Sequence, residues 1–277
     1  MSIHRNNYKQ ANANGYTLIE LLVVIGVIAV LLSVVLPSLA RAKEQCREVI
    51  CRSNLRQLVL ANQGYASENN SEYVLAAPDI FSGQNLRRWH GVREDINSYF
   101  EVEKSPLADY LADGEVKRCP TKVEFRNGEP WDWDFEQGCG GYGYNMTYLG
   151  SRVWENYTAE NCALPTRESE VKSLSSTLMF ADTAMTKLES GQPYYLEYSF
   201  TEPYFFVVNG KPNTSWGKPS PSIHFRHNQQ ANTAWSDGHI TAETIAPESS
   251  INAYGVTSYD VSIGWFDPLD NSLFDLK

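Results

Sequence analysis

The fold of this chain is set by Gly15-Tyr16-Thr17-Leu18-Ile19-Glu20 and by the apolar run that follows it as far as Leu36. From Leu18 to Leu36 there are 19 residues, and Glu20 is the only charged one. At about 1.5 Å per residue, a helix of this length covers the hydrocarbon core of a bilayer. A carboxylate inside such a helix is costly in hydrocarbon, so the position of Glu20 indicates a function that depends on a partner.

The segments on either side of the apolar run carry basic residues. Positions 1–15 hold Arg5 and Lys9 and no acid, which is typical of a short cytoplasmic segment. Basic residues also follow from Arg41 onward, so charge alone does not set the orientation. The alternative is an ordinary signal peptide cut after Ala40, but such peptides have apolar cores of about 7 to 15 residues and no internal acid.

The start of the chain resembles a known processing motif. A glycine, a large residue, Thr17-Leu18-Ile19-Glu20 and a long aliphatic stretch are similar to the N-terminus of type IV prepilins and type II secretion pseudopilins. The resemblance implies that a prepilin peptidase cuts between Gly15 and Tyr16 and that Tyr16 is then N-methylated. Pro37 falls where helices of this family carry a proline, and a proline inside a helix predicts a kink.

The same resemblance implies a location and partners. The chain would be a single-pass inner-membrane protein with its head in the periplasm, and it would join other pilin or pseudopilin subunits in a filament. Cleavage would leave a positive amine on Tyr16, which Glu20 of a neighbouring subunit can neutralise when the helices stack. An ion pair of this kind is favourable in low dielectric only when both partners are present. We therefore expect Glu20 to set the register of assembly, and interfacial snorkelling of Glu20 is the alternative.

Apolar residues continue at helical spacing beyond Pro37. We expect one helix over residues 16–66, with a transmembrane part at about 18–36 and an amphipathic part at 38–66. Residues 67–277, which we call the head, contain short strand patterns and loops. The fold expected is α+β and pilin-like, with a long N-terminal transmembrane helix packed on an antiparallel sheet. The expected apolar face of the amphipathic part comprises Leu39, Ala42, Cys46, Val49, Ile50, Leu58, Ala61 and Tyr65.

The clearest motif of the head lies near the C-terminus. His227 and Asp237 are separated by nine residues, and Gly238 follows. This spacing resembles the H-X9-DG motif of prepilin-type proteins with a DUF1559-like head. Two hairpins are predicted, with reversals at 228–230 and at Asp237-Gly238, where both residues tolerate positive φ. Segments with a looser resemblance to that group are Asn54-Leu55-Arg56-Gln57-Leu58, Cys119-Pro120, Gly143-Tyr144-Asn145 and Ala181-Asp182.

The role of the C-terminal motif follows from its residue types. We favour a hydrogen bond between a histidine and an aspartate at a turn, here His227 and Asp237. With His224 and His239 nearby, a metal site is the alternative, although alternation along strands puts some of these side chains on opposite faces.

The five cysteines suit an oxidising periplasm better than a metal cage, because no CxxC pair occurs. We expect disulfides between Cys51 and Cys119 and between Cys139 and Cys162, with Cys46 free. Five free thiols are the alternative.

Charge and motif content narrow the function. The formal net charge of −10 makes nucleic acid an unsuitable partner for the head. The chain has no GxSxG elbow, and the glycine-rich stretch 138–143 lacks the lysine of a phosphate loop. We therefore expect a structural subunit, with no enzyme activity and no cofactor.

Three further functions stay open for the head. Calcium binding is one, because Asp260, Asp267 and Asp270 offer oxygens, although without the dense spacing of a calcium loop. A membrane-tethered carbohydrate-binding module is another, because tryptophans can stack on sugar rings. A secreted or tethered hydrolase is the third. The tryptophans concerned are Trp131, Trp133 and Trp216.

Overall fold

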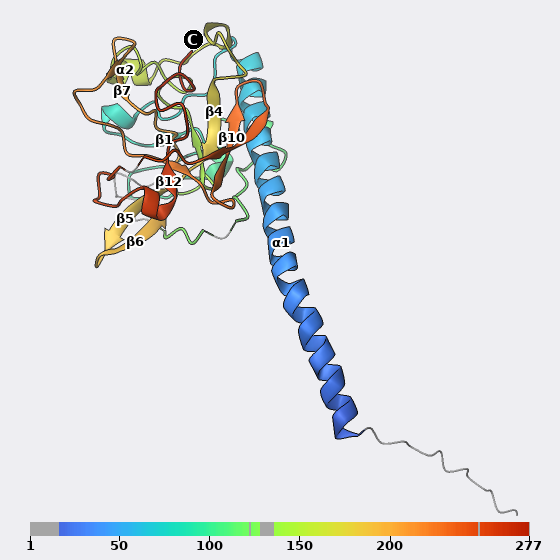
Figure 1. Cartoon of the computed structure of the whole chain (residues 1–277). Coiled ribbons are helices and arrows are strands. Elements are labelled where there is room, and N and C mark those ends of the chain that lie inside the picture. The colour runs from blue at the N-terminus through green and yellow to red at the C-terminus, as the bar shows by residue number, and fades with distance from the viewer. Residues whose placement is uncertain (1–16, 122, 128–135, 249, 277) are drawn as a thin grey trace, which may run out of the picture. The chain divides into compact units, whose positions relative to one another are not determined.

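A computed structural model describes residues 17–121, 123–127, 136–248 and 250–276 (Figure 1). Its contacts divide the chain into two units, Met1–Gln45 and Cys46–Lys277. The expected cleavage site at Gly15 and Tyr16 lies outside the described residues, as do Trp131 and Trp133.

Helix α1 (Leu18–Glu68) is continuous, passes through Pro37, and ends two residues beyond the expected position. Its first part is long and apolar enough to cross a membrane, judged by length and composition. The aliphatic side chains of this part are exposed, as the values of 80% for Leu18 and 60% for Leu36 illustrate. The kink at Pro37 stays a prediction.

Within the second unit, α1 buries one face. Val49 and Ile50 were expected on that face, but they are 66% and 50% exposed. The buried stripe starts at Cys51 and includes two asparagines. Asn54 donates to the Tyr142 hydroxyl (3.1 Å), and such satisfied polar groups are compatible with burial. The buried residues of α1 are Cys51, Asn54, Leu55, Leu58, Val59, Ala61, Asn62 and Ala66.

The main sheet has four antiparallel strands in the order β11-β10-β4-β3. They are β3 (Tyr142–Tyr144), β4 (Leu178–Asp182), β10 (Gln230–Trp235) and β11 (Ile240–Thr244). All five residues of β4 are buried, so β4 is the centre of the core. Figure 1 shows the C-terminal part of α1 alongside β4 and β10. The expected α+β fold, with a helix on an antiparallel sheet, is confirmed.

Aromatic packing joins the sheet to α1. Tyr144 and Phe180 stack with ring centroids 4.7 Å apart, and the wholly buried Trp89 meets Phe180 edge to face at 5.2 Å. Leu55 of α1 belongs to the same cluster and has no exposed surface. Burying a leucine side chain contributes about 1.5–3 kcal/mol, so this face of α1 is a substantial part of the core.

The remaining strands of the described chain form short antiparallel pairs. These are β1 (Arg87–Arg88) with β2 (Gly91–Val92), β5 (Met185–Glu189) with β6 (Gln192–Leu196), β7 (Phe206–Val208) with β8 (Lys211–Asn213), and β9 (Ile223–His224) with β12 (Ile263–Gly264). The short helices are η1 (Ile80–Ser82), η2 (Val102–Lys104), η3 (Ala108–Tyr110), α2 (Ala159–Cys162), η4 (Glu168–Glu170) and η5 (Tyr259–Val261).

The two predicted reversals near the C-terminus both occur, and the hairpin of β10 with β11 is confirmed, but their details differ from expectation. Asn228 and Gln229 form the two-residue turn, with φ of 49° and 66°. The loop at Asp237 is wider, and of its Asp-Gly pair only Gly238 has positive φ. The cause is Ser236, whose N–H donates to the Thr177 carbonyl (3.0 Å) and thereby leaves the β10–β11 ladder. Strand β9 itself pairs with β12, so the first expected hairpin is reduced to the antiparallel bridge between His227 and Gln230.

Candidate functional site: the start of the apolar helix and a buried cysteine–histidine cluster

The first turn of α1 is closed by Thr17 and Glu20. The Glu20 carboxylate accepts hydrogen bonds from the Thr17 N–H (2.8 Å) and the Thr17 hydroxyl (2.9 Å). In return, the Glu20 N–H donates to the Thr17 hydroxyl (3.2 Å). This reciprocal arrangement is a capping box, which satisfies N–H groups that a helix start leaves without partners. Within a single chain, Glu20 therefore already has a partner inside its own turn.

The two ends of the H-X9-DG spacing have separate partners. Asp237 is at the wide loop, where its Oδ1 lies 2.5 Å from His239 Nδ1 and accepts from the His239 N–H (3.0 Å). His227 is wholly buried, and its Nε2 lies 3.3 Å from Asp182 Oδ2. The favoured hydrogen bond between His227 and Asp237 is wrong, because the turn at Asn228 and the wide loop at Asp237 hold them at different places. His224 is buried and stacks on Tyr195.

A buried cluster collects four side chains from distant parts of the chain, namely Cys51, Cys119, Asp182 and His227. We call it the cysteine–histidine cluster. One polar atom of each residue lies within 4.8 Å of the corresponding atoms of the other three, and all four residues are buried. Cys51 comes from α1 and Asp182 from the end of β4, whereas Cys119 and His227 come from loops.

Close polar contacts link the members of the cluster. Cys51 Sγ donates to Asp182 Oδ1 (3.1 Å), and Cys119 Sγ lies 3.6 Å from His227 Nε2. The other ring nitrogen, His227 Nδ1, lies 3.1 Å from the Thr121 hydroxyl. One imidazole nitrogen thus faces both a sulfur and a carboxylate.

Electrostatics favours the charged forms of three of the four residues in the cluster, namely Asp182, Cys119 and His227. Burial by itself raises the pKa of Asp182, but Arg226 and His227 outweigh it and lower that pKa. A hydrogen bond from Cys51 lowers the pKa of Cys119, burial opposes this, and His227 lowers it further. Burial lowers the pKa of His227, but its contacts with Asp182 and Cys119 outweigh burial and raise it. Burial raises the pKa of the fourth member, the Cys51 thiol.

The geometry of the cluster does not support nucleophilic catalysis. A cysteine–histidine–carboxylate triad requires the carboxylate to orient one ring nitrogen while the other takes the proton of the thiol. Here Asp182 and Cys119 both face Nε2 of His227, and Nδ1 faces Thr121. A hydrolase function gains no support from this arrangement.

All five cysteines lie in the described part of the chain, and all five are free thiols. Cys51 and Cys119 come together as expected but share the cluster with an aspartate and a histidine. Cys162 donates to the Ala77 carbonyl (3.1 Å), so its sulfur is engaged away from Cys139. The two expected disulfides are therefore absent from this structure, and Cys46 is free as expected. Cys46 was also expected on the apolar face of the helix, but it is exposed.

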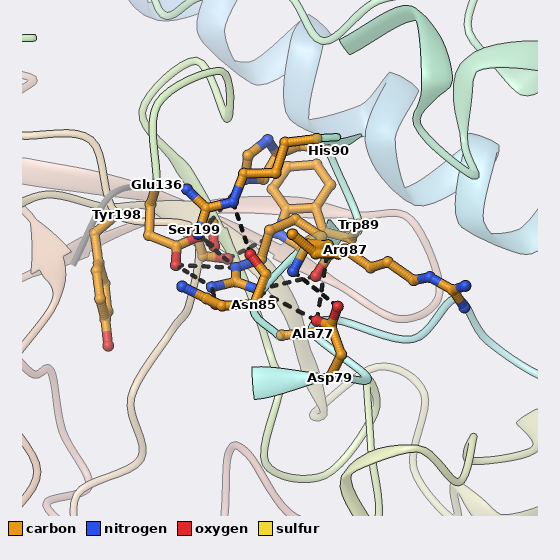
Figure 2. A network of polar contacts seen from close by, with 12 residues as sticks. Ala77, Asp79, Asn85, Arg87, Trp89, His90, Glu136, Tyr198 and Ser199 are labelled. Atoms are coloured by element: carbon orange, nitrogen blue, oxygen red, sulfur yellow. Dashed lines mark hydrogen bonds and ion pairs between the residues drawn. The ribbon is translucent and has the colours of Figure 1, made fainter. Parts of the chain in front are cut away.

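A second buried network, around Glu136, was not singled out in the sequence. Arg88 Nε donates to both Glu136 oxygens (2.9 and 2.8 Å), and the Ser199 hydroxyl donates to Oε2 (2.6 Å). Figure 2 shows His90, Asn85 and Asp79 gathered around these groups. Burial raises the pKa of Glu136, but Arg88 and His90 outweigh burial and lower it to about 2. Arg88 and Glu136 are 48 positions apart, so no local pattern marks them as partners.

The residues considered for calcium and glycan binding lie apart or at the surface. Asp260, Asp267 and Asp270 are exposed, and they do not belong to the one candidate metal-binding group found among the described residues. Trp216 is 57% exposed and contacts Tyr157 edge to face. These positions give no specific support for calcium or glycan binding.

Comparison with known proteins identifies a motif at the start of the chain. Residues 10–36 match the model of the prokaryotic N-terminal methylation motif. The chain carries a prepilin-type methylation motif. The expected resemblance is thereby confirmed at the N-terminus, whereas the DUF1559-like character of the head stays a prediction.

The chain is also similar to a curated protein, the type IV wide pilus major component PilA4 of Thermus thermophilus. The two are 40% identical over 60 residues, which is 22% of this chain and 46% of the relative. The chain therefore spans about half the length of the relative it matches. No solved structure matches the chain significantly.

Proposed function

We propose that this protein is a structural subunit of a type IV pilus-like or type II secretion pseudopilus filament. The observation that carries the proposal is the coincidence of the methylation motif at 10–36 with the apolar, exposed start of α1. Exposed aliphatic surface on this scale requires lipid or a neighbouring helix to cover it. A pilin-type subunit uses both in turn, first in the membrane and then in the filament.

Processing would precede assembly. We propose that a prepilin peptidase cuts after Gly15 and methylates Tyr16, with the chain held in the inner membrane and the head in the periplasm. The similarity to a pilus component supports assembly with other pilin or pseudopilin subunits. The free amine of Tyr16 would then meet Glu20 of a neighbour, in exchange for part of the capping box that Glu20 makes with Thr17.

A role in building a filament requires no catalytic group. Helix α1 runs without a break from the apolar segment into the second unit, so a subunit held by its apolar segment would carry its head into the filament. Neither membrane-tethered glycan binding nor hydrolysis is supported by any described contact.

Mass spectrometry of the mature N-terminus tests the proposal. The chain is expressed in a host that has the prepilin peptidase, and we expect an N-methylated terminus at Tyr16. Gly15→Val should abolish the cut. Gly26→Val is a matched control, because a side chain carbon added at Gly26 meets nothing within 4 Å, and it should leave the cut intact. A mature chain that begins at Arg41 would show signal peptidase processing and overturn the proposal.

A further inference from the structure

We propose that the cysteine–histidine cluster is a zinc site, with Cys51, Cys119, Asp182 and His227 as its four ligands. The inference is independent of the filament role. It reverses the expectation from sequence that the cysteines are unsuited to a metal cage.

The ligand set is the first support. Two thiolates, one imidazole and one carboxylate are ligand types that zinc takes in proteins, in a four-coordinate tetrahedral site. All four residues are buried, which is typical of a closed structural site. A catalytic zinc keeps one position open for water or substrate, and the cluster has four protein ligands instead of three.

The distances between ligand atoms are the second support. Zinc bonds of about 2.3 Å to sulfur and about 2.0–2.1 Å to nitrogen or oxygen place tetrahedral ligand atoms about 3.3–3.8 Å from one another. Cys119 Sγ lies 3.6 Å from His227 Nε2, Asp182 Oδ2 lies 3.3 Å from the same nitrogen, and Cys51 Sγ lies 3.1 Å from Asp182 Oδ1. The first two separations fall within the range expected around one ion, whereas the third is shorter and involves the other Asp182 oxygen. One ligand atom from each of the four residues lies within 4.8 Å of the other three.

The surrounding groups orient the ligands. Metal-binding histidines generally use the second ring nitrogen for a hydrogen bond that fixes the ring. His227 Nδ1 has such a contact, 3.1 Å from the Thr121 hydroxyl, and this leaves Nε2 for the metal. The Asn232 N–H donates to Asp182 Oδ2 (2.8 Å), and the Tyr142 hydroxyl donates to Cys51 Sγ (3.5 Å).

Charge balance is the third support. With both cysteines as thiolates, the ligands carry three negative charges in a buried place. The Arg226 side chain is 1% exposed and its Nε lies 3.9 Å from Asp182 Oδ1, so it supplies one positive charge. Uncompensated buried charge is strongly unfavourable. A divalent cation brings the sum to zero.

The position of the cluster indicates a structural role for the metal. Cys51 is on α1 and Asp182 is on the central strand β4, so a bound ion would fasten the helix to the sheet of the second unit. Cys119 belongs to a loop with little regular structure, and the ion would hold that loop as well. A ligand set drawn from both a helix and a strand is consistent with a site that stabilises the fold.

Metal analysis of the full chain in detergent micelles tests the proposal. The protein is reduced, loaded with Zn²⁺ and freed of unbound metal, and zinc is measured by inductively coupled plasma mass spectrometry. We expect about one zinc per chain, with an X-ray absorption spectrum of two sulfur ligands at about 2.3 Å and two nitrogen or oxygen ligands at about 2.0 Å. Replacement by Co²⁺ should give the visible bands of a tetrahedral thiolate site.

Variants separate ligands from bystanders. Cys119→Ser and Cys51→Ser should each remove stoichiometric zinc. Cys162→Ser, at another buried cysteine, and Cys46→Ser should retain it. Thr121→Val keeps all four ligands and should weaken zinc affinity by about 10- to 100-fold through the loss of the hydroxyl beside His227.

Two outcomes would overturn the proposal without recourse to any variant. One is a wild-type chain that holds no stoichiometric zinc after reduction and loading. A Cys51–Cys119 disulfide in the unreduced protein would then be the state that replaces the zinc site. The other is bound zinc whose absorption spectrum contains no sulfur ligand.

Discussion

His227 pairs with Asp182, with Nε2 of the ring 3.3 Å from Oδ2 of the carboxylate, and not with the Asp237 that completes its sequence motif. The pairing joins the loop after β9 to the end of β4, across 45 positions of sequence. Asp237 instead closes its own loop with His239. The two aspartates should therefore contribute to stability by very different amounts.

Asp182→Asn should lower the free energy of unfolding by about 3–5 kcal/mol. The substitution leaves Arg226 buried beside a neutral group, and breaking a buried ion pair carries a cost of that size. Asp237→Asn is the matched control and should cost less than about 1 kcal/mol, because the Asp237 contacts are partly exposed. Urea unfolding of the full chain in micelles, followed by tryptophan fluorescence, measures both. Equal losses would contradict the assignment of Asp182 as the partner of His227.

Glu20 should affect assembly through its charge and not through its hydrogen bonds with the Thr17 hydroxyl. Glu20→Gln keeps an oxygen that can accept from Thr17 but removes the negative charge, whereas Thr17→Val keeps the charge and removes the hydroxyl of the capping box. We expect Glu20→Gln to be cut normally and to assemble poorly, and Thr17→Val to assemble. Filament yield by electron microscopy and cleavage by mass spectrometry are the readouts. Normal filaments from Glu20→Gln would refute a role of charge in register.

Leu55→Ala should destabilise the second unit by about 2–5 kcal/mol, the usual cost of truncating a buried leucine. Leu55 has no exposed surface, whereas Leu60 on the same helix is 53% exposed. Leu60→Ala therefore makes the same chemical change and should alter the free energy of unfolding by less than about 0.5 kcal/mol. If the two losses were similar, α1 would not pack on the sheet through the face that holds Leu55.

Stability should fall as the pH falls from neutral toward 2, in two stages. His90 is buried and its pKa is lowered, chiefly by burial. The unfolded chain therefore takes up a proton near the usual value of 6.5 that the folded chain refuses, and stability declines below that pH. Glu136 has its pKa lowered to about 2 from 4.5. Its contribution is full above pH 4.5 and is lost between 4.5 and 2.

Glu136→Gln isolates the second stage. At neutral pH it should cost about 3–5 kcal/mol, because Arg88 is left buried without its counter-charge. Asp79 lies 4.0 Å from Arg88 and supplies only a distant replacement. The difference between wild type and Glu136→Gln should shrink as the pH falls from 4.5 to 2, which urea unfolding at a series of pH values measures. If the difference in free energy of unfolding stayed constant over this pH range, Glu136 would not be ionised in the folded protein.

Local periodicity was enough to predict α1 and its apolar first part, because helical spacing and hydropathy are properties of neighbouring residues. The buried face was predicted less well. Val49 and Ile50 are apolar but exposed, while Asn54 and Asn62 are polar but buried. The Asn62 side chain accepts from the Val74 N–H (2.9 Å). A hydrogen bond to a distant partner decides such burial, and no pattern within the helix carries that information.

The candidate site was predicted in pieces only. Cys51 and Cys119 were expected to be neighbours, His227 was named for its motif, and the Ala181-Asp182 segment was noted as similar to related heads. The contacts that bring these residues together were not predicted, because Cys51 and Asp182 are separated by 131 positions and Cys119 and His227 by 108. The expected disulfides and the pairing of His227 with Asp237 both followed from pairing residues by type or by spacing.

The amino-acid sequence by itself determined the prepilin-type start and the single long helix, because a processing motif and a hydrophobic span are read locally by a peptidase and by a bilayer. Only the tertiary structure decided that Arg88 and Glu136 pair in the core and that four distant side chains meet in one buried cluster. Such groups converge because the packing of α1 on β4 brings remote segments into one low-dielectric interior, where each charge must find a partner.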